Sequence, residues 1–146
     1  MRMAIPGLSI IEETARLVKE GKSVTLNANG HSMYPFINGK TDDITLVAVK
    51  TAAIGDVVLA WVNDTHYVIH RIIAIQGDCF TLMGDGNLNE QEHCFFKDII
   101  ARVDYVIKRK TGKRIYLYSK YYKRMAMIWF KLLPIRRYLL AIYRRI

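Results

Sequence analysis

Ser32 lies in a segment whose residues suit a tight, rigid turn. It follows Gly30 and precedes Pro35, directly after a short β-type run at residues 24–26. Such a turn can present the Ser32 hydroxyl and its backbone N–H outward. A serine hydroxyl is a weak nucleophile at neutral pH unless a nearby base accepts its proton. The turn alone is ordinary loop chemistry, so a catalytic interpretation needs a base within reach.

His70 is the candidate base, and it lies inside an apolar strand predicted over residues 67–75. Strand alternation places His70 on the same face as Val68 and Ile72, with Arg71 on the other face. A histidine on such a strand is more often a structural residue than a catalytic one. His70 by itself therefore does not establish catalysis.

Five short segments in a fixed order change that interpretation. Together they resemble the successive motifs of type I signal peptidases and the related LexA-like peptidases. The segments are Gly30-His31-Ser32-Met33-Tyr34-Pro35, Asp43-Ile44-Thr45-Leu46-Val47, Gly55-Asp56-Val57-Val58, His70-Arg71-Ile72-Ile73 and Gly84-Asp85-Gly86-Asn87. The resemblance implies a serine endopeptidase that cuts an extended peptide segment.

A histidine at the base position is the pattern of the archaeal and endoplasmic-reticulum type, whereas the bacterial signal peptidases and LexA-like repressors use lysine. The resemblance therefore implies Ser32 as nucleophile and His70 as general base. An aspartate near the Gly-Asp motif assists the histidine in this type, which makes Asp85 the first choice for the third residue. Asp85 can equally be a turn-capping carboxylate. The second acidic position of the motif falls between Glu90 and Glu92, and these are the alternative acidic partners.

The resemblance is imperfect around the oxyanion hole. Signal peptidases commonly carry a serine two residues before the nucleophile, where this chain has Gly30. Backbone N–H groups of the turn, with His31 assisting and Met33 completing the motif, are then expected to bind the oxyanion. The apolar strands around Ile44 and Leu59 are expected to line the cleft, where an extended substrate adds to the sheet edge.

Hydrophobic periodicity and turn residues predict the elements that position these groups. A helix is predicted over residues 9–20, and from Tyr121 onward the pattern becomes helical again, with a break at Pro134. The fold class is mainly β, a bent antiparallel sheet or partly closed barrel. We divide the chain into an N-terminal helix (1–22), a β domain (23–118) and a basic amphipathic helical tail (119–146). The predicted strands cover residues 24–26, 44–50, 57–62, 67–75, 79–83, 99–108 and 114–118.

The formal charge of +9 is concentrated in the C-terminal part of the chain, because residues 108–146, which include the tail, hold 13 Lys or Arg and no Asp or Glu. An anionic partner is therefore expected for the tail alone. We expect peripheral contact with an anionic membrane and no nucleic acid, since the basic residues alternate with large apolar ones. Trp129, Phe130, Leu132 and Leu139 are expected to enter the acyl boundary. The alternative is that the tail packs on the β domain or on a second copy.

No metal or other cofactor is predicted. His66 and His70 share a strand face, but four residues of strand rise separate them by about 13 Å, too far for one ion. Cys79 and Cys94 flank a turn-like stretch and could face each other across a hairpin, although free thiols are the preferred interpretation.

The sequence shows no secretory signal and no uncharged apolar run long enough for a membrane-spanning helix, so a cytoplasmic or peripherally membrane-associated protein is expected. The alternative to an active peptidase is a weak or inactive relative that serves as a peptide-binding or regulatory module. A LexA-like repressor is disfavoured, because the residues before Gly30 are too few for a helix-turn-helix domain and the catalytic lysine is absent.

Overall fold

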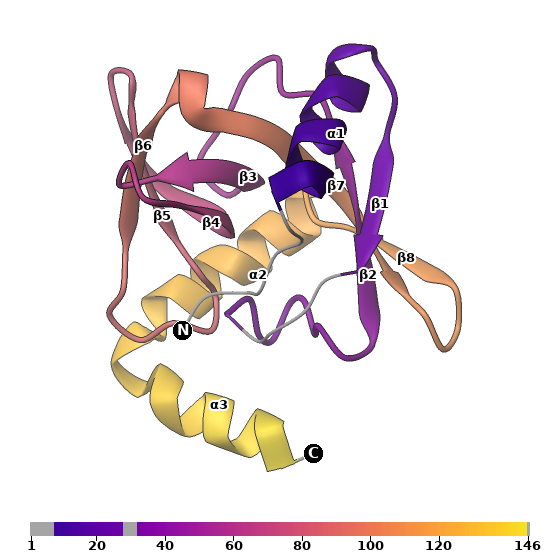
Figure 1. The fold of residues 1–146 in the computed structure, drawn as a ribbon. Helices are drawn as coiled ribbons and strands as arrows, with labels where there is room; N and C mark the ends of the chain where they lie inside the picture. The colour runs from indigo at the N-terminus through magenta and orange to yellow at the C-terminus, as the bar shows by residue number, and fades with distance from the viewer. Residues whose placement is uncertain (1–7, 28–31, 146) are drawn as a thin grey trace.

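The computed structural model describes residues 8–27 and 32–145 of the chain. Within these ranges the backbone forms one antiparallel sheet of eight strands, curled into a half-barrel (Figure 1). The mainly β fold and bent antiparallel sheet predicted from the sequence are confirmed. The strands are β1 (Val24–Asn27), β2 (Asp42–Val47), β3 (Val57–Val62), β4 (His66–Gln76), β5 (Cys79–Met83), β6 (Glu92–Phe95), β7 (Ile99–Lys108) and β8 (Lys113–Tyr116).

The strand order across the sheet is β1-β2-β7-β3-β4-β5-β6, and β8 pairs with β7 as the return strand of a hairpin. The strands predicted from alternation are all present, and those predicted over residues 57–62, 79–83 and 99–108 have the predicted bounds. The other four have shifted ends; the second, for example, begins at Asp42 and ends at Val47. The sequence analysis missed β6, a four-residue strand of sequence Glu-His-Cys-Phe. A segment this short and polar resembles a loop unless its pairing with β5 is known.

Apolar side chains cover both faces of the curved sheet. Successive residues of β3 and β4 alternate between two core clusters: Leu59 and Ile69 belong to the first, whereas Val58 and Val68 belong to the second. This is the alternation predicted for a strand buried on both sides. The strands around Ile44 and Leu59 are expected to line a substrate cleft, but these two side chains themselves point into the first core cluster and are buried there.

The curl of the sheet returns β6 toward the turn between β3 and β4. Asn63 in that turn donates its N–H to the carbonyl of His93, at 2.9 Å, and its side-chain oxygen accepts from the His93 N–H, also at 2.9 Å. Along β6, Glu92 and Cys94 are buried while His93 and Phe95 are exposed. The link through Asn63 therefore fixes which side of β6 faces the barrel interior.

The two cysteines are free thiols and do not face each other. In the β5–β6 register Cys79 is opposite Phe95, and Cys94 is opposite Phe80. An offset of one residue points the two cysteine side chains to opposite faces of the hairpin.

The helices are α1 (Leu8–Lys19), α2 (Lys120–Lys131) and α3 (Arg136–Arg145), with a short 3₁₀ turn at Leu133–Ile135 between α2 and α3. α1 packs near β1 and β7; in Figure 1, α2 crosses the middle of the view and α3 lies below the sheet. The predicted break at Pro134 is confirmed, because proline cannot continue the hydrogen-bond ladder of α2. Among the described residues, no helix is long and apolar enough to cross a membrane.

Candidate active site

Ser32 lies in the turn that follows β1, and its side chain contacts His70 in the middle of β4. Ser32 Oγ lies 3.2 Å from His70 Nε2, although the two residues are 38 positions apart in the chain. The Ser32 side chain is 1 % exposed and the His70 side chain is fully buried. A hydroxyl at hydrogen-bond distance from an imidazole nitrogen is the arrangement that a serine nucleophile requires.

The second nitrogen of His70 contacts a buried carboxylate. Glu92 Oε1 lies 2.6 Å from His70 Nδ1, and Glu92 is 2 % exposed. When Glu92 is ionised it can only accept a hydrogen bond, and Nδ1 then carries the hydrogen in this pair. That tautomer leaves the Nε2 lone pair directed at Ser32, which is the orientation that proton transfer from the hydroxyl needs.

The carboxylate of Asp85, which the sequence predicted as the acidic partner of His70, is bound by Arg71. That prediction is therefore corrected, because the carboxylate that contacts His70 is Glu92. Arg71 Nε and Nη2 donate to Asp85 Oδ1 and Oδ2 at 2.9 and 2.7 Å, a two-pronged pair that is almost fully buried. Arg71 Nη1 also donates to the Gly55 carbonyl at 2.9 Å. Because Arg71 lies on the face of β4 opposite to His70, its carboxylate partner is drawn away from the imidazole. Glu90, the other alternative, is exposed.

The loop of residues 84–87, which we call the Gly-Asp loop, packs directly on the Ser32–His70 pair. Gly86 donates its N–H to the Ser32 carbonyl at 2.6 Å. A Cβ atom on Gly84 would lie 2.5 Å from the Ser32 carbonyl oxygen and 3.0 Å from His70 Nε2. Only glycine lets the backbone approach the pair this closely. The sequence analysis did not identify this role of Gly84, which the Gly-Asp motif alone does not reveal.

Met33 anchors the turn after Ser32. Its side chain is fully buried in the first core cluster, and its sulfur lies 3.3 Å from the Asp85 backbone nitrogen, which donates to it. Met33 therefore ties the turn of residues 32–38, which we call the nucleophile turn after the role expected for Ser32, to the Gly-Asp loop through its side chain. Gly30 and His31, the other two residues expected at the oxyanion hole, lie outside the described residues.

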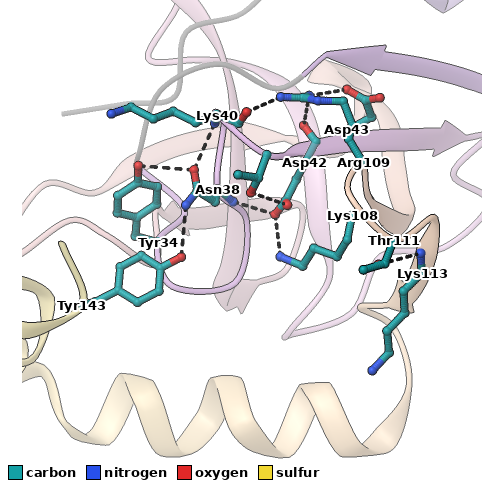
Figure 2. A network of polar contacts seen from close by, with 11 residues as sticks. Tyr34, Asn38, Lys40, Asp42, Asp43, Lys108, Arg109, Thr111, Lys113 and Tyr143 are labelled. Atoms are coloured by element: carbon teal, nitrogen blue, oxygen red, sulfur yellow. Dashed lines mark hydrogen bonds and ion pairs between the residues drawn. The ribbon is translucent and has the colours of Figure 1, made fainter. Parts of the chain in front are cut away.

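A polar network holds the far end of the same turn (Figure 2). The buried carboxylate of Asp42 accepts from the Asn38 N–H and from Lys108 Nζ, both at 2.8 Å. Arg109 extends the network to Asp43, 2.7 Å away, and to the Lys40 carbonyl. These contacts join the turn to β2 and β7, so the segment that follows Ser32 is held at its far end as well as at Met33.

The described residues contain no group of three or more His, Cys, Asp or Glu side chains placed to hold a metal ion. His66 Nδ1 lies 2.6 Å from Thr65 Oγ1, and His93 Nδ1 lies 3.2 Å from Thr81 Oγ1. A cavity of about 850 Å³ is lined by residues of β2, β7 and α2, among others, and none of Ser32, His70 and Glu92 lines it.

Comparisons of the chain with protein-family models, with curated proteins and with solved structures found no match. The assignment of this site to a class therefore depends on the geometry of the chain's own residues. The order of contacts, from serine to histidine to buried carboxylate, resembles the triad geometry that serine hydrolases of unrelated folds share.

Proposed function

We propose that the protein is a serine endopeptidase with the chemistry of the signal-peptidase superfamily. The observation that carries the proposal is the continuous contact from Ser32 Oγ through the His70 ring to Glu92, with distances of 3.2 and 2.6 Å. A peptide-binding module has no chemical need for a serine, a histidine and a carboxylate in this series of contacts. The ordered motifs around Ser32, His70 and Gly84 support the same class.

The proposed reaction proceeds in two steps. Ser32 Oγ attacks the scissile carbonyl carbon while its proton passes to His70 Nε2, and Glu92 stabilises the resulting imidazolium. The imidazolium then protonates the leaving amine, so the peptide bond breaks and an acyl ester on Ser32 remains. In the second step His70 takes a proton from water as the water oxygen attacks the ester carbonyl. The bond to Ser32 Oγ then breaks, His70 returns the proton to Ser32 Oγ, and the new carboxyl terminus leaves.

The substrate is an extended peptide that adds as a strand to a sheet edge. Within the described residues β1 has β2 as its one neighbour, and β1 leads along the chain toward Ser32. Because Ser32 is only 1 % exposed, a substrate carbonyl reaches its Oγ only after the surrounding backbone opens. Turnover is therefore expected to be slow and selective for peptides that drive this opening.

A diverse peptide library tests the proposal directly, whatever the natural substrate is. Wild-type protein is incubated with a peptide mixture that includes small residues before possible cleavage sites, and new termini are identified by mass spectrometry. Cleavage should be lost in Ser32→Ala and His70→Ala and retained in Ser23→Ala and His66→Ala, which alter exposed or half-exposed residues of the same types. Cleavage that persists in Ser32→Ala contradicts the proposal. If wild type binds peptides without cutting any, the binding-module alternative replaces it.

The C-terminal helices are proposed to attach the protein to an anionic membrane surface. Their outward faces carry exposed apolar side chains at helical spacing, and exposed basic side chains lie beside them. An interfacial helix needs this combination, because apolar groups enter the acyl boundary while cations meet the headgroups. The exposed apolar residues are Tyr121, Met125, Met127, Ile128 and Phe130 in α2, and Ile135, Tyr138 and Ile142 in and before α3; the basic ones include Lys120, Arg124, Lys131 and Arg137.

Trp129 is not part of this outward face, which corrects one expectation from the sequence. Its indole N–H donates to the Asp85 carbonyl at 2.5 Å, so the ring faces the β domain. The tail thus packs on the domain with one side, as the alternative interpretation expected, and presents the opposite side to solvent.

Co-sedimentation with lipid vesicles tests the membrane proposal. Binding should require phosphatidylglycerol in phosphatidylcholine vesicles, weaken as salt rises and fall in Ile128→Ser, while Ile54→Ser, an exposed isoleucine of the β domain, should bind as wild type does. Absence of binding at low salt overturns the proposal. Binding to DNA in place of vesicles would assign the basic residues to nucleic acid, and a change in self-association in Ile128→Ser would assign the face to a second copy.

A further inference from the structure

The inner face of the C-terminal helices contacts the Gly-Asp loop through two directed hydrogen bonds. Trp129 Nε1 donates to the Asp85 carbonyl, and Arg136 Nη1 donates to the Asn87 carbonyl at 2.8 Å. The loop between β5 and β6 thus receives a hydrogen bond from each of the two helices. These bonds are to backbone carbonyls, so they set the path of the loop itself.

Arg136 is an unusual residue for a surface helix. It is only 2 % exposed, its guanidinium stacks on the Trp129 ring at 5.2 Å, and its Nη2 also donates to the Trp129 carbonyl. Burial lowers the pKa of Arg136, and the positive charge of Arg71 acts in the same direction, while the Asp85 carboxylate opposes the shift. Burying a cation costs free energy that a helix resting loosely on the domain would not incur.

α3 also contacts the nucleophile turn. Asn38 Nδ2 donates to the Tyr143 hydroxyl at 3.3 Å, and the Tyr143 ring packs edge-on against Tyr34 at 5.1 Å between ring centres (Figure 2). Tyr34 is two residues from the nucleophile Ser32. The tail therefore contacts both segments that meet at the Ser32–His70 pair.

These two segments determine the distance between the reacting atoms. The Gly-Asp loop bonds the Ser32 carbonyl through the Gly86 N–H at 2.6 Å and lies against His70 Nε2 at Gly84. A shift of the loop moves the Ser32 backbone relative to the imidazole, and a displacement of about 1 Å in a catalytic site can lower the rate about 100-fold.

We infer that Trp129, Arg136 and Tyr143 are positioning residues, and that the C-terminal helices form a brace holding the nucleophile turn and the Gly-Asp loop at the separation that catalysis requires. This inference rests on the proposed peptidase function for its kinetic consequences. Its structural consequence, the placement of the His70 ring, is independent of any activity. The membrane contact proposed above uses the opposite face of the helices and does not bear on it.

Two conservative variants test the brace, each with a matched control. Trp129→Phe removes the indole N–H and keeps a ring beside Arg136, and Trp61→Phe makes the same change in the other tryptophan of the chain. Tyr143→Phe removes the hydroxyl that accepts from Asn38, and Tyr138→Phe makes the same change on the exposed side of α3. In both test variants kcat should fall about 10-fold or more with KM within about two-fold, whereas the controls should match wild type.

A second readout uses the His70 ring signals in the ¹⁵N and ¹H NMR spectra, assigned through His70→Ala. The Nδ1–H signal of His70 should shift or broaden in Trp129→Phe and Tyr143→Phe and stay in place in Trp61→Phe and Tyr138→Phe. If wild type cuts no peptide, the proposed peptidase function is disproved, but the NMR comparison still tests whether the C-terminal helices position His70. Unchanged His70 signals in both test variants, or wild-type kcat in both, overturn the inference.

Discussion

Glu92 Oε1 lies 2.6 Å from His70 Nδ1, although the two residues are 22 positions apart and belong to strands that do not pair with each other. The contact exists because the sheet curls and the Asn63–His93 bonds bring β6 back toward the start of β4. Asp85 is closer to His70 in sequence, yet its carboxylate is fully engaged by Arg71. The two carboxylates therefore have separable roles.

Glu92→Gln should lower turnover while leaving the fold intact. The amide is nearly the same size as the carboxylate but cannot stabilise an imidazolium or enforce the tautomer, so kcat should fall at least about 100-fold. Glu90→Gln is the matched control, because Glu90 is an exposed glutamate just before β6, two positions from Glu92. Steady-state kinetics and thermal unfolding of both variants check this. A Glu92→Gln enzyme with wild-type kcat would remove Glu92 from the mechanism.

Asp85→Asn should show the reverse pattern, with a large loss of stability. It leaves the Arg71 guanidinium buried without its anionic partner, and breaking a buried pair costs about 3–5 kcal/mol. Urea unfolding measures this cost. Turnover measured well below the melting temperature should fall less than in Glu92→Gln. Unchanged stability together with a loss of turnover as severe as in Glu92→Gln would restore Asp85 as the third catalytic residue.

Gly84→Ala should impair catalysis through steric contact with the pair. The added Cβ would lie 2.5 Å from the Ser32 carbonyl and 3.0 Å from His70 Nε2, so the loop must move. Activity should fall at least about 10-fold. Gly77→Ala is the comparison: it strains a backbone with φ of +60° but places its Cβ in open space, so it should lower stability and spare activity. Equal activity in the two variants would argue against the close approach at Gly84.

The buried thiol of Cys94 gives a pH-dependent prediction. Burial is the main cause that raises the pKa of Cys94 from 9.0 to about 11, and nearby Asp98 and Cys79 add to the shift. The folded state therefore holds this proton more tightly than the unfolded state, so the contribution to stability is present below pH 9 and is lost as the pH rises toward 11. Relative to Cys94→Ala, wild type should lose on the order of 2 kcal/mol of unfolding free energy across this window.

Urea unfolding of both proteins under reducing conditions, at pH 8 and at pH 11, measures that difference. A constant gap between wild type and Cys94→Ala at the two pH values would contradict the raised pKa. Under native conditions at pH 8, iodoacetamide should also leave Cys94 largely unmodified, because the reactive thiolate is scarce.

The sequence allowed Ser32 and His70 to be paired through the order of the motifs, whereas periodicity alone assigned His70 only to a strand face. Glu92 was an alternative and not the first choice, because β6 is too short and polar to be recognised before its register with β5 is known. The partner of Asp85 was missed for a related reason. Alternation places Arg71 away from His70, but it does not say which carboxylate meets it.

The contacts between the tail and the β domain could not be predicted from the sequence pattern either. An amphipathic helix with Trp129 on an apolar side is compatible with a lipid surface and with a protein surface, since both bury the same groups. Only the tertiary structure shows that the indole N–H reaches the Asp85 carbonyl. By contrast, the break at Pro134 follows from local backbone chemistry and was predicted correctly.

The most direct test of the account is the kinetics of Ser32→Ala, His70→Ala and the double variant, on the peptide that wild type cuts fastest in the library. Because the two side chains perform one proton transfer, each single change should lower kcat/KM at least about 1,000-fold, and the double variant should be hardly worse than either single one. Multiplicative losses in the double variant, or full activity in Ser32→Ala, would contradict the claim that Ser32 and His70 act as a nucleophile and its base.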